Sequence, residues 1–78
     1  MTPEQIASLA QSLEDNEAFQ MALNGQRASA LDALAAIDAS DTLGILKHQA
    51  IVKVVDDIRA DLGQFIRSGQ KRGAPGIA

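Results

Sequence analysis

The segment from Ser40 to Arg67 most constrains the fold, because its apolar residues recur at spacings of three and four. Such spacing places side chains on one face of an α-helix, whereas a half-buried strand would alternate with a period of two. The series is Leu43, Ile51, Val54, Val55, Ile58, Leu62, Phe65 and Ile66. The pattern predicts one long amphipathic helix whose apolar face is buried against another helix.

A short helix is predicted at the N-terminus. Thr2 is suited to cap it, Pro3 fits the first helical position, and Gln5 stands where a capping-box partner belongs. The apolar face of this helix consists of Ile6, Leu9, Ala10 and Leu13. The cap-forming residues between Ser12 and Asn16 favour a break or kink after it over an uninterrupted helix.

A second long helix is predicted from Glu17 to Ile37. Its apolar stripe consists of Phe19, Leu23, Ala30, Leu34 and Ile37, with Leu31 at the edge. Its many alanines favour a helix and let a neighbouring helix approach closely. The polar turn Asp38–Thr42 follows, with Ser40 or Asp41 placed to cap the last helix. A turn this short predicts that the two long helices run antiparallel as an αα-hairpin.

These elements predict an all-α fold without strands. It consists of an antiparallel αα-hairpin of two long helices, with a short N-terminal helix packed across one of them or continuing it. We expect residues 1–67 to form one helical domain. Ser68 and Gly69 interrupt the helical pattern, and Gly73, Pro75 and Gly76 prevent its continuation. Residues 68–78 are therefore predicted to be an extended basic tail.

The composition limits the core that this chain can build. The protein has 78 residues, two phenylalanines, no other aromatic residue and no cysteine. A core of Leu, Ile, Val and Ala in so short a chain is thin, and disulfides or thiolate zinc sites cannot reinforce it. We therefore expect an oligomer, or a subunit that completes its burial on a partner.

The charge is unevenly distributed along the chain. Residues 1–66 carry four basic and ten acidic side chains, a net charge of −6, whereas residues 67–78 carry three basic side chains and no acid. An acidic helical body argues against binding of nucleic acid by the folded part, because phosphate contacts need clustered Lys and Arg.

The start of the chain lacks the pattern of a signal peptide, and no apolar run is long enough to span a membrane. We expect a location in the cytosol or in a particle assembled there, without a membrane partner.

No group of residues predicts catalysis, a metal site or a cofactor site. His48 is the only histidine, and it falls at the margin of the apolar face with no second imidazole or thiol to complete a metal site. The carboxylates form small groups at predicted helix starts and on the solvent face, where paired acid–base chemistry has no cleft. No phosphate-binding loop is present. The sequence predicts a protein that is not an enzyme and needs no metal or cofactor.

Six residues are candidates for partner binding: Arg27, Arg67, Lys71, Arg72, Pro75 and Ile77. Arg27 lies between Leu23 and Leu34 on the apolar side of its predicted helix. A charge there is costly unless it is paired. Arg27 either pairs with an aspartate of the other long helix, such as Asp61, or with a partner subunit. The other five are Arg67, at the end of the predicted helix, and four residues of the tail. The tail has three interpretations: a weak nucleic-acid arm, a disordered end, or a peptide that orders in a groove of a neighbouring protein.

Two resemblances point to a class of protein. The segment Asp15 to Phe19, followed by Arg27-Ala28-Ser29-Ala30-Leu31-Asp32-Ala33-Leu34 and a long helix, resembles small helical proteins encoded among the morphogenesis genes of tailed bacteriophages. The ending Gln70 to Gly76 is similar to the basic, Gly/Pro-rich end of the lambda-type head-to-tail joining family W. That family carries a β-hairpin between its helices, where this chain has only the Ser40-Asp41-Thr42 turn.

The resemblance implies a non-enzymatic, multi-copy component of a phage particle. It would be a capsid decoration (cement) protein or part of the head–tail connector, bound to the major capsid protein or a neck protein. Its location would be the virion, and the host cytoplasm during assembly. The alternative is a DNA-packaging or regulatory accessory protein whose basic tail contacts DNA. A shallow loss of affinity with added salt would distinguish the alternative, because an arm with three charges gives a slope of roughly −3 at most.

Overall fold

The computed structural model describes residues 1–72, with side chains through residue 70. It consists of the helices α1 (Pro3–Glu14), α2 (Glu17–Ala36) and α3 (Thr42–Arg72). No strand occurs within these 72 residues. The prediction of an all-α fold with two long helices and a short N-terminal one is therefore confirmed.

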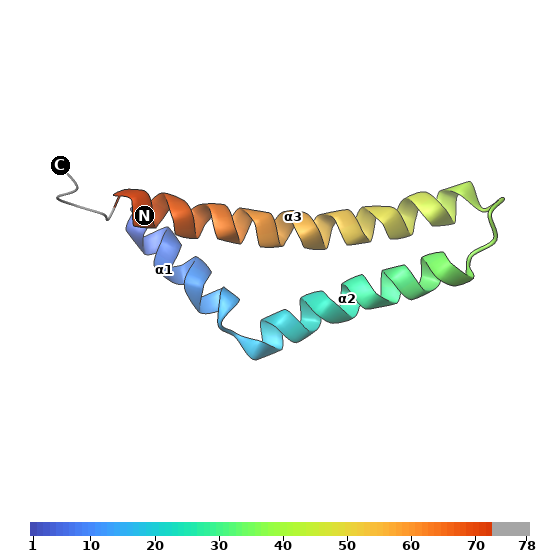
Figure 1. Ribbon diagram of the computed structural model, residues 1–78, viewed down its shortest axis with the longest axis horizontal. Helices are drawn as coiled ribbons and strands as arrows, with labels where there is room; N and C mark the ends of the chain where they lie inside the picture. The colour runs from blue at the N-terminus through green and yellow to red at the C-terminus, as the bar shows by residue number, and fades with distance from the viewer. Residues whose placement is uncertain (73–78) are drawn as a thin grey trace.

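The three helices are arranged around α3, as Figure 1 shows. α1 and α2 form a V, whose open ends approach the two ends of α3, and the N-terminus lies beside the C-terminal end of α3. Both α1 and α2 pack on α3, and they touch each other much less. α1 therefore packs across the second half of α3, one of the two placements predicted for it.

Local side-chain chemistry explains where α1 begins and where α2 follows. The Thr2 hydroxyl accepts a hydrogen bond from the Gln5 N–H at 3.1 Å, and the Gln5 side chain accepts one from the Thr2 N–H at 2.7 Å. This is the predicted capping box, which satisfies two otherwise unpaired donors. The predicted break falls at Asp15–Asn16, where the Asn16 side chain caps α2 by accepting from the Phe19 N–H at 2.8 Å. Glu17 then stands in the first turn, where its charge suits the helix dipole.

Two aspartates organise the connection between α2 and α3. One carboxylate oxygen of Asp38 accepts hydrogen bonds from the Ser40 N–H at 2.8 Å and from its hydroxyl at 2.6 Å, and these bonds lower the pKa of Asp38. Asp41 then caps α3, because its side chain accepts from the Gly44 N–H at 3.0 Å. Of the two candidate caps, the structure uses Asp41.

The predicted C-terminal boundary of the helical domain was wrong. α3 does not end at Arg67 but continues to Arg72, so residues 68–72 are helical and do not belong to an extended tail. The reason is the position of Gly69, which is buried against α1 and lies close to Ala7 and the Pro3 carbonyl oxygen. This glycine permits close packing of two helices instead of ending one. Residues 73–78, including the predicted tail residues Pro75 and Ile77, lie outside the described part of the chain.

The core of the described chain is small, and the molecule is elongated. The buried apolar residues are Ala10, Leu23, Ala30, Val55 and Leu62. Each of the three large ones contributes about 2 kcal/mol by leaving water. The radius of gyration is 17.0 Å, and the extents are 58 × 24 × 20 Å. A compact domain of this length would have a radius of gyration of about 11.5 Å. The chain alone thus buries little of its apolar surface.

Two of the four glycines in the described helices, Gly25 and Gly69, should respond oppositely to the same substitution. A Cβ at Gly25 meets nothing within 4 Å, so Gly25→Ala is expected to raise the free energy of unfolding by about 0.5–1 kcal/mol through helix propensity. A Cβ at Gly69 would overlap Ala7, so Gly69→Ala is expected to lower it by about 1–3 kcal/mol despite the same gain in propensity. Thermal and urea unfolding followed by circular dichroism measures both. Equal shifts at the two positions would contradict the packing of α1 on α3.

Candidate functional site

The most distinctive surface of the molecule is an uncovered apolar face of α3. Val54 and Val55 are neighbours and therefore point about 100° apart around the helix. Val55 is 4 % exposed beneath α2, whereas Val54 is 54 % exposed. Residues Ile51, Val55, Leu62 and Ile66 follow the covered side, and Leu43, Ala50, Val54, Ile58 and Phe65 follow the exposed side. We call this second set the open face.

The open face corrects one part of the prediction from sequence. The apolar series between Leu43 and Ile66 was expected to be about wide enough for one partner helix. α1 and α2 together cover only its Val55 side, and Leu43 remains 81 % exposed. From Leu43 to Phe65 the open face is about 33 Å long. Soluble monomers seldom expose large contiguous apolar patches, and here Leu43, Val54 and Phe65 are 81, 54 and 44 % exposed.

Two shallow grooves border the open face where the neighbouring helices meet α3. One groove, of about 340 Å³, lies between α2 and α3 and is lined by Leu23, Gln26, Ala50, Ile51, Val54, Val55 and Ile58. The other, of about 180 Å³, lies between α1 and α3 and is lined by Met1, Ile6, Leu9, Ala10, Leu13, Leu62 and Phe65. Both are lined mostly by apolar side chains, with Gln26 as the polar residue of the first, so they suit aliphatic side chains.

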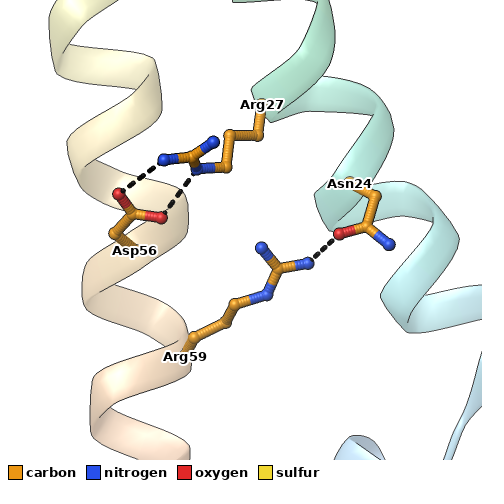
Figure 2. A network of polar contacts seen from close by, with 4 residues as sticks. All are labelled: Asn24, Arg27, Asp56 and Arg59. Carbon is orange, nitrogen blue, oxygen red and sulfur yellow. Dashed lines mark hydrogen bonds and ion pairs between the residues drawn. The ribbon is translucent and has the colours of Figure 1, made fainter.

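A polar contact joins α2 to the other side of α3, as Figure 2 shows. Arg27 donates from Nε to Asp56 Oδ1 at 2.9 Å and from Nη2 to Asp56 Oδ2 at 3.4 Å. The hydrogen bond from Arg27 is the main cause that lowers the pKa of Asp56, and the same bond raises the pKa of Arg27. The pair is solvent-accessible, so it fixes the register of α2 against α3 more than it stabilises them.

Arg59 makes a second polar link between the same helices. Its guanidinium donates to the side-chain oxygen of Asn24, one turn of α2 before Arg27 (Figure 2). Its charge also helps to lower the pKa of Asp56. Sequence reasoning did not single out Arg59 or Asn24, because neither interrupts an apolar stripe. A pair of polar residues facing across two helices becomes visible only when the register of the helices is known.

Arg27 pairs within the chain, as one of its two interpretations required, but with Asp56 instead of the suggested Asp61. Asp61 lies on the same side of α3 as Val54, seven residues further on, and so faces away from α2. The hypothesis that Arg27 also contacts a partner subunit is untested. The structure therefore gives Arg27 an interhelical role.

The predicted tail residues do not form a site with Arg27 within the described part of the chain. Arg67 is exposed on α3, and its guanidinium donates to the Gln64 side-chain oxygen at 3.3 Å. It lies eleven residues beyond Asp56, about 16 Å along the helix. Lys71 and Arg72 are the last residues of α3, whereas Pro75 and Ile77 lie outside the described residues.

The described part of the chain contains no group of three His, Cys, Asp or Glu side chains placed to bind a metal ion. His48 is half-buried at the edge of the covered side, as predicted, and its Nδ1 is buried without a hydrogen-bond partner among the described residues. No described helix combines the length and the hydropathy that a membrane-spanning helix needs.

Comparison of the chain with models of protein families, with curated proteins and with solved structures found no match.

The Arg27–Asp56 contact should appear in a titration. We expect the pKa of the Asp56 carboxyl to lie below its ordinary value near 4 and to return toward it in Arg27→Gln, because the dominant hydrogen bond is lost. The contribution of the pair to stability is present above the ordinary aspartate pKa and is lost as the pH falls through the lowered one. Carboxyl NMR titration measures this. Arg59→Gln is the matched control and should raise the pKa less, so an equal rise in both variants would contradict the assignment.

Proposed function

We propose that this chain is a non-enzymatic structural protein of a tailed-phage virion, present in many copies as a capsid decoration protein or as part of the head–tail connector. Its partner in this proposal is the major capsid protein or a neck protein, and its location is the virion, with the host cytoplasm during assembly. The sequence resemblances suggest this class of protein. The surface chemistry suggests how such a protein would work.

The observation that carries the proposal is the excess of exposed over buried apolar side chains. Ten large apolar residues among those described are exposed, Met1 and nine others spread over the three helices, whereas the buried set of five includes two alanines. A chain of this kind gains stability by covering apolar surface on other subunits. Within the proposal, α2 and α3 act as an antiparallel αα-hairpin, a form that the short connection at residues 37–41 favours.

A symmetric particle suits such a subunit because weak contacts repeated many times add up through multivalency. Apolar side chains that face away from the body of the molecule are the natural contacts. On α2 these are Met21, which is 73 % exposed, and Leu31. The acidic charge of residues 1–66 keeps the free chain soluble until it binds.

Quantitative mass spectrometry of virions tests the proposal. Particles of the phage that encodes the chain, purified by caesium chloride gradient, are expected to contain it in a fixed number of copies per capsid. Incorporation should survive high salt, because apolar burial dominates the contact. Particles that lack the chain would contradict the proposal, and retention of the chain on DNA with a salt slope near −3 would support the packaging or regulatory alternative.

A matched pair of variants links incorporation to the apolar surface. Met21→Glu places a charge among the exposed apolar residues of α2, whereas Gln49→Glu adds the same charge at an exposed polar position of α3. Met21→Glu is expected to reduce the copy number, and Gln49→Glu to leave it unchanged. Both variants should keep the helix content of the parent in circular dichroism. Equal incorporation of both would show that the α2 apolar surface is not the contact.

A further inference from the structure

The open face of α3 has an internal symmetry about Val54. Leu43 and Phe65 lie eleven residues on either side of it, Lys47 and Asp61 lie seven residues on either side, and Ala50 and Ile58 lie four residues on either side. Seven and eleven residues are close to two and three helical turns of about 3.6 residues, so all these positions share one side of α3. The apolar residues are arranged almost as mirror images, but the two charged residues have opposite signs.

We propose that the open face binds the open face of a second copy of this chain, with the two α3 helices antiparallel and a two-fold axis at Val54. This inference concerns the isolated chain and does not rest on a virion role. In this register a residue at position i faces position 108−i of the second copy. Leu43 meets Phe65, Ala50 meets Ile58, and Val54 meets itself.

Charge complementarity selects the second copy and sets its direction. Lys47 and Asp61 are both exposed on the open face, and neither has an ion-pair partner among the described residues. The antiparallel register places Lys47 opposite Asp61 of the second copy, and the symmetry makes this ion pair twice. A parallel register would place Lys47 against Lys47 and Asp61 against Asp61, which is repulsive. The charges thus favour one orientation of a self-complementary interface.

The shape of the surface supports the same register. Leu43, at the start of α3, is 81 % exposed. The proposed register brings it beside Phe65 of the second copy, at the apolar groove of about 180 Å³ between α1 and α3. The Leu43 side chain, which its own helix leaves exposed, therefore meets a hollow lined by Leu9, Leu13 and Phe65. The outward Met21 and Leu31 of α2 stay available for a different partner.

Charge-swap variants test the proposal in the full-length chain. The parent is expected to sediment at twice its mass of 8.2 kDa. Lys47→Asp alone and Asp61→Lys alone should each weaken the dimer about tenfold or more, because each creates two like-charge contacts. An equimolar mixture of the two single variants should regain the dimer, because the heterodimer restores both opposite-charge contacts. That recovery also shows that both variants are folded. A monomeric parent, or a mixture no tighter than its components, would overturn the proposal.

Cysteine cross-linking tests the register, and the chain has no native cysteine to interfere. Val54→Cys is expected to form a disulfide dimer on oxidation. Leu43→Cys alone should not, but Leu43→Cys mixed with Phe65→Cys should form a mixed disulfide. Cross-linking of Leu43→Cys with itself would indicate a parallel pair and overturn the antiparallel register. Ala60→Cys, on an exposed side of α3 away from the open face, is the control and should stay monomeric under the same conditions.

Discussion

The structure depends on the mismatch between the apolar face of α3 and the helices available to cover it. In length the match is close, since α1 with 12 residues and α2 with 20 residues pack along a helix of 31. The width of the apolar face does not match, because a helix packed on one side of α3 leaves side chains about 100° further around the helix in water. Val55, which is covered, and Val54, which is exposed, are adjacent residues that show this difference. A thin core and an exposed apolar strip are therefore two consequences of one constraint.

The small and polar residues determine which side of α3 is covered. Gly69 allows α1 to approach closely at one end, next to Ala7 and the Pro3 carbonyl oxygen. Arg27 and Arg59 join α2 to α3 further along, through Asp56 and Asn24. These contacts hold α1 and α2 on the Val55 side of α3. The apolar residues on the Val54 side, such as Leu43, Val54 and Phe65, then remain exposed.

Local signals in the sequence predicted the helices and most of their boundaries. The Thr2–Gln5 capping box, the break before Glu17 and the aspartates of the turn act within a few residues, so their effects could be derived without a fold. The end of α3 could not be predicted in this way, because Gly69 looks like a helix terminator until α1 is known to pack on it. The pairing of Arg27 with Asp56 instead of Asp61 likewise depends on the rotation of α3 relative to α2. The spacing of apolar residues predicted a buried face but not how much of it a neighbour covers.

In our proposal, this chain completes its fold by covering the open face of α3 with another protein chain, here a second copy. The concentration dependence of thermal unfolding tests this most directly, because association of folded chains stabilises them by mass action. The midpoint of unfolding of the parent should rise by several degrees when the protein concentration is raised a hundredfold, and that of Val54→Asp should not change. A parent midpoint independent of concentration, with the same value as that of Val54→Asp, would contradict the account.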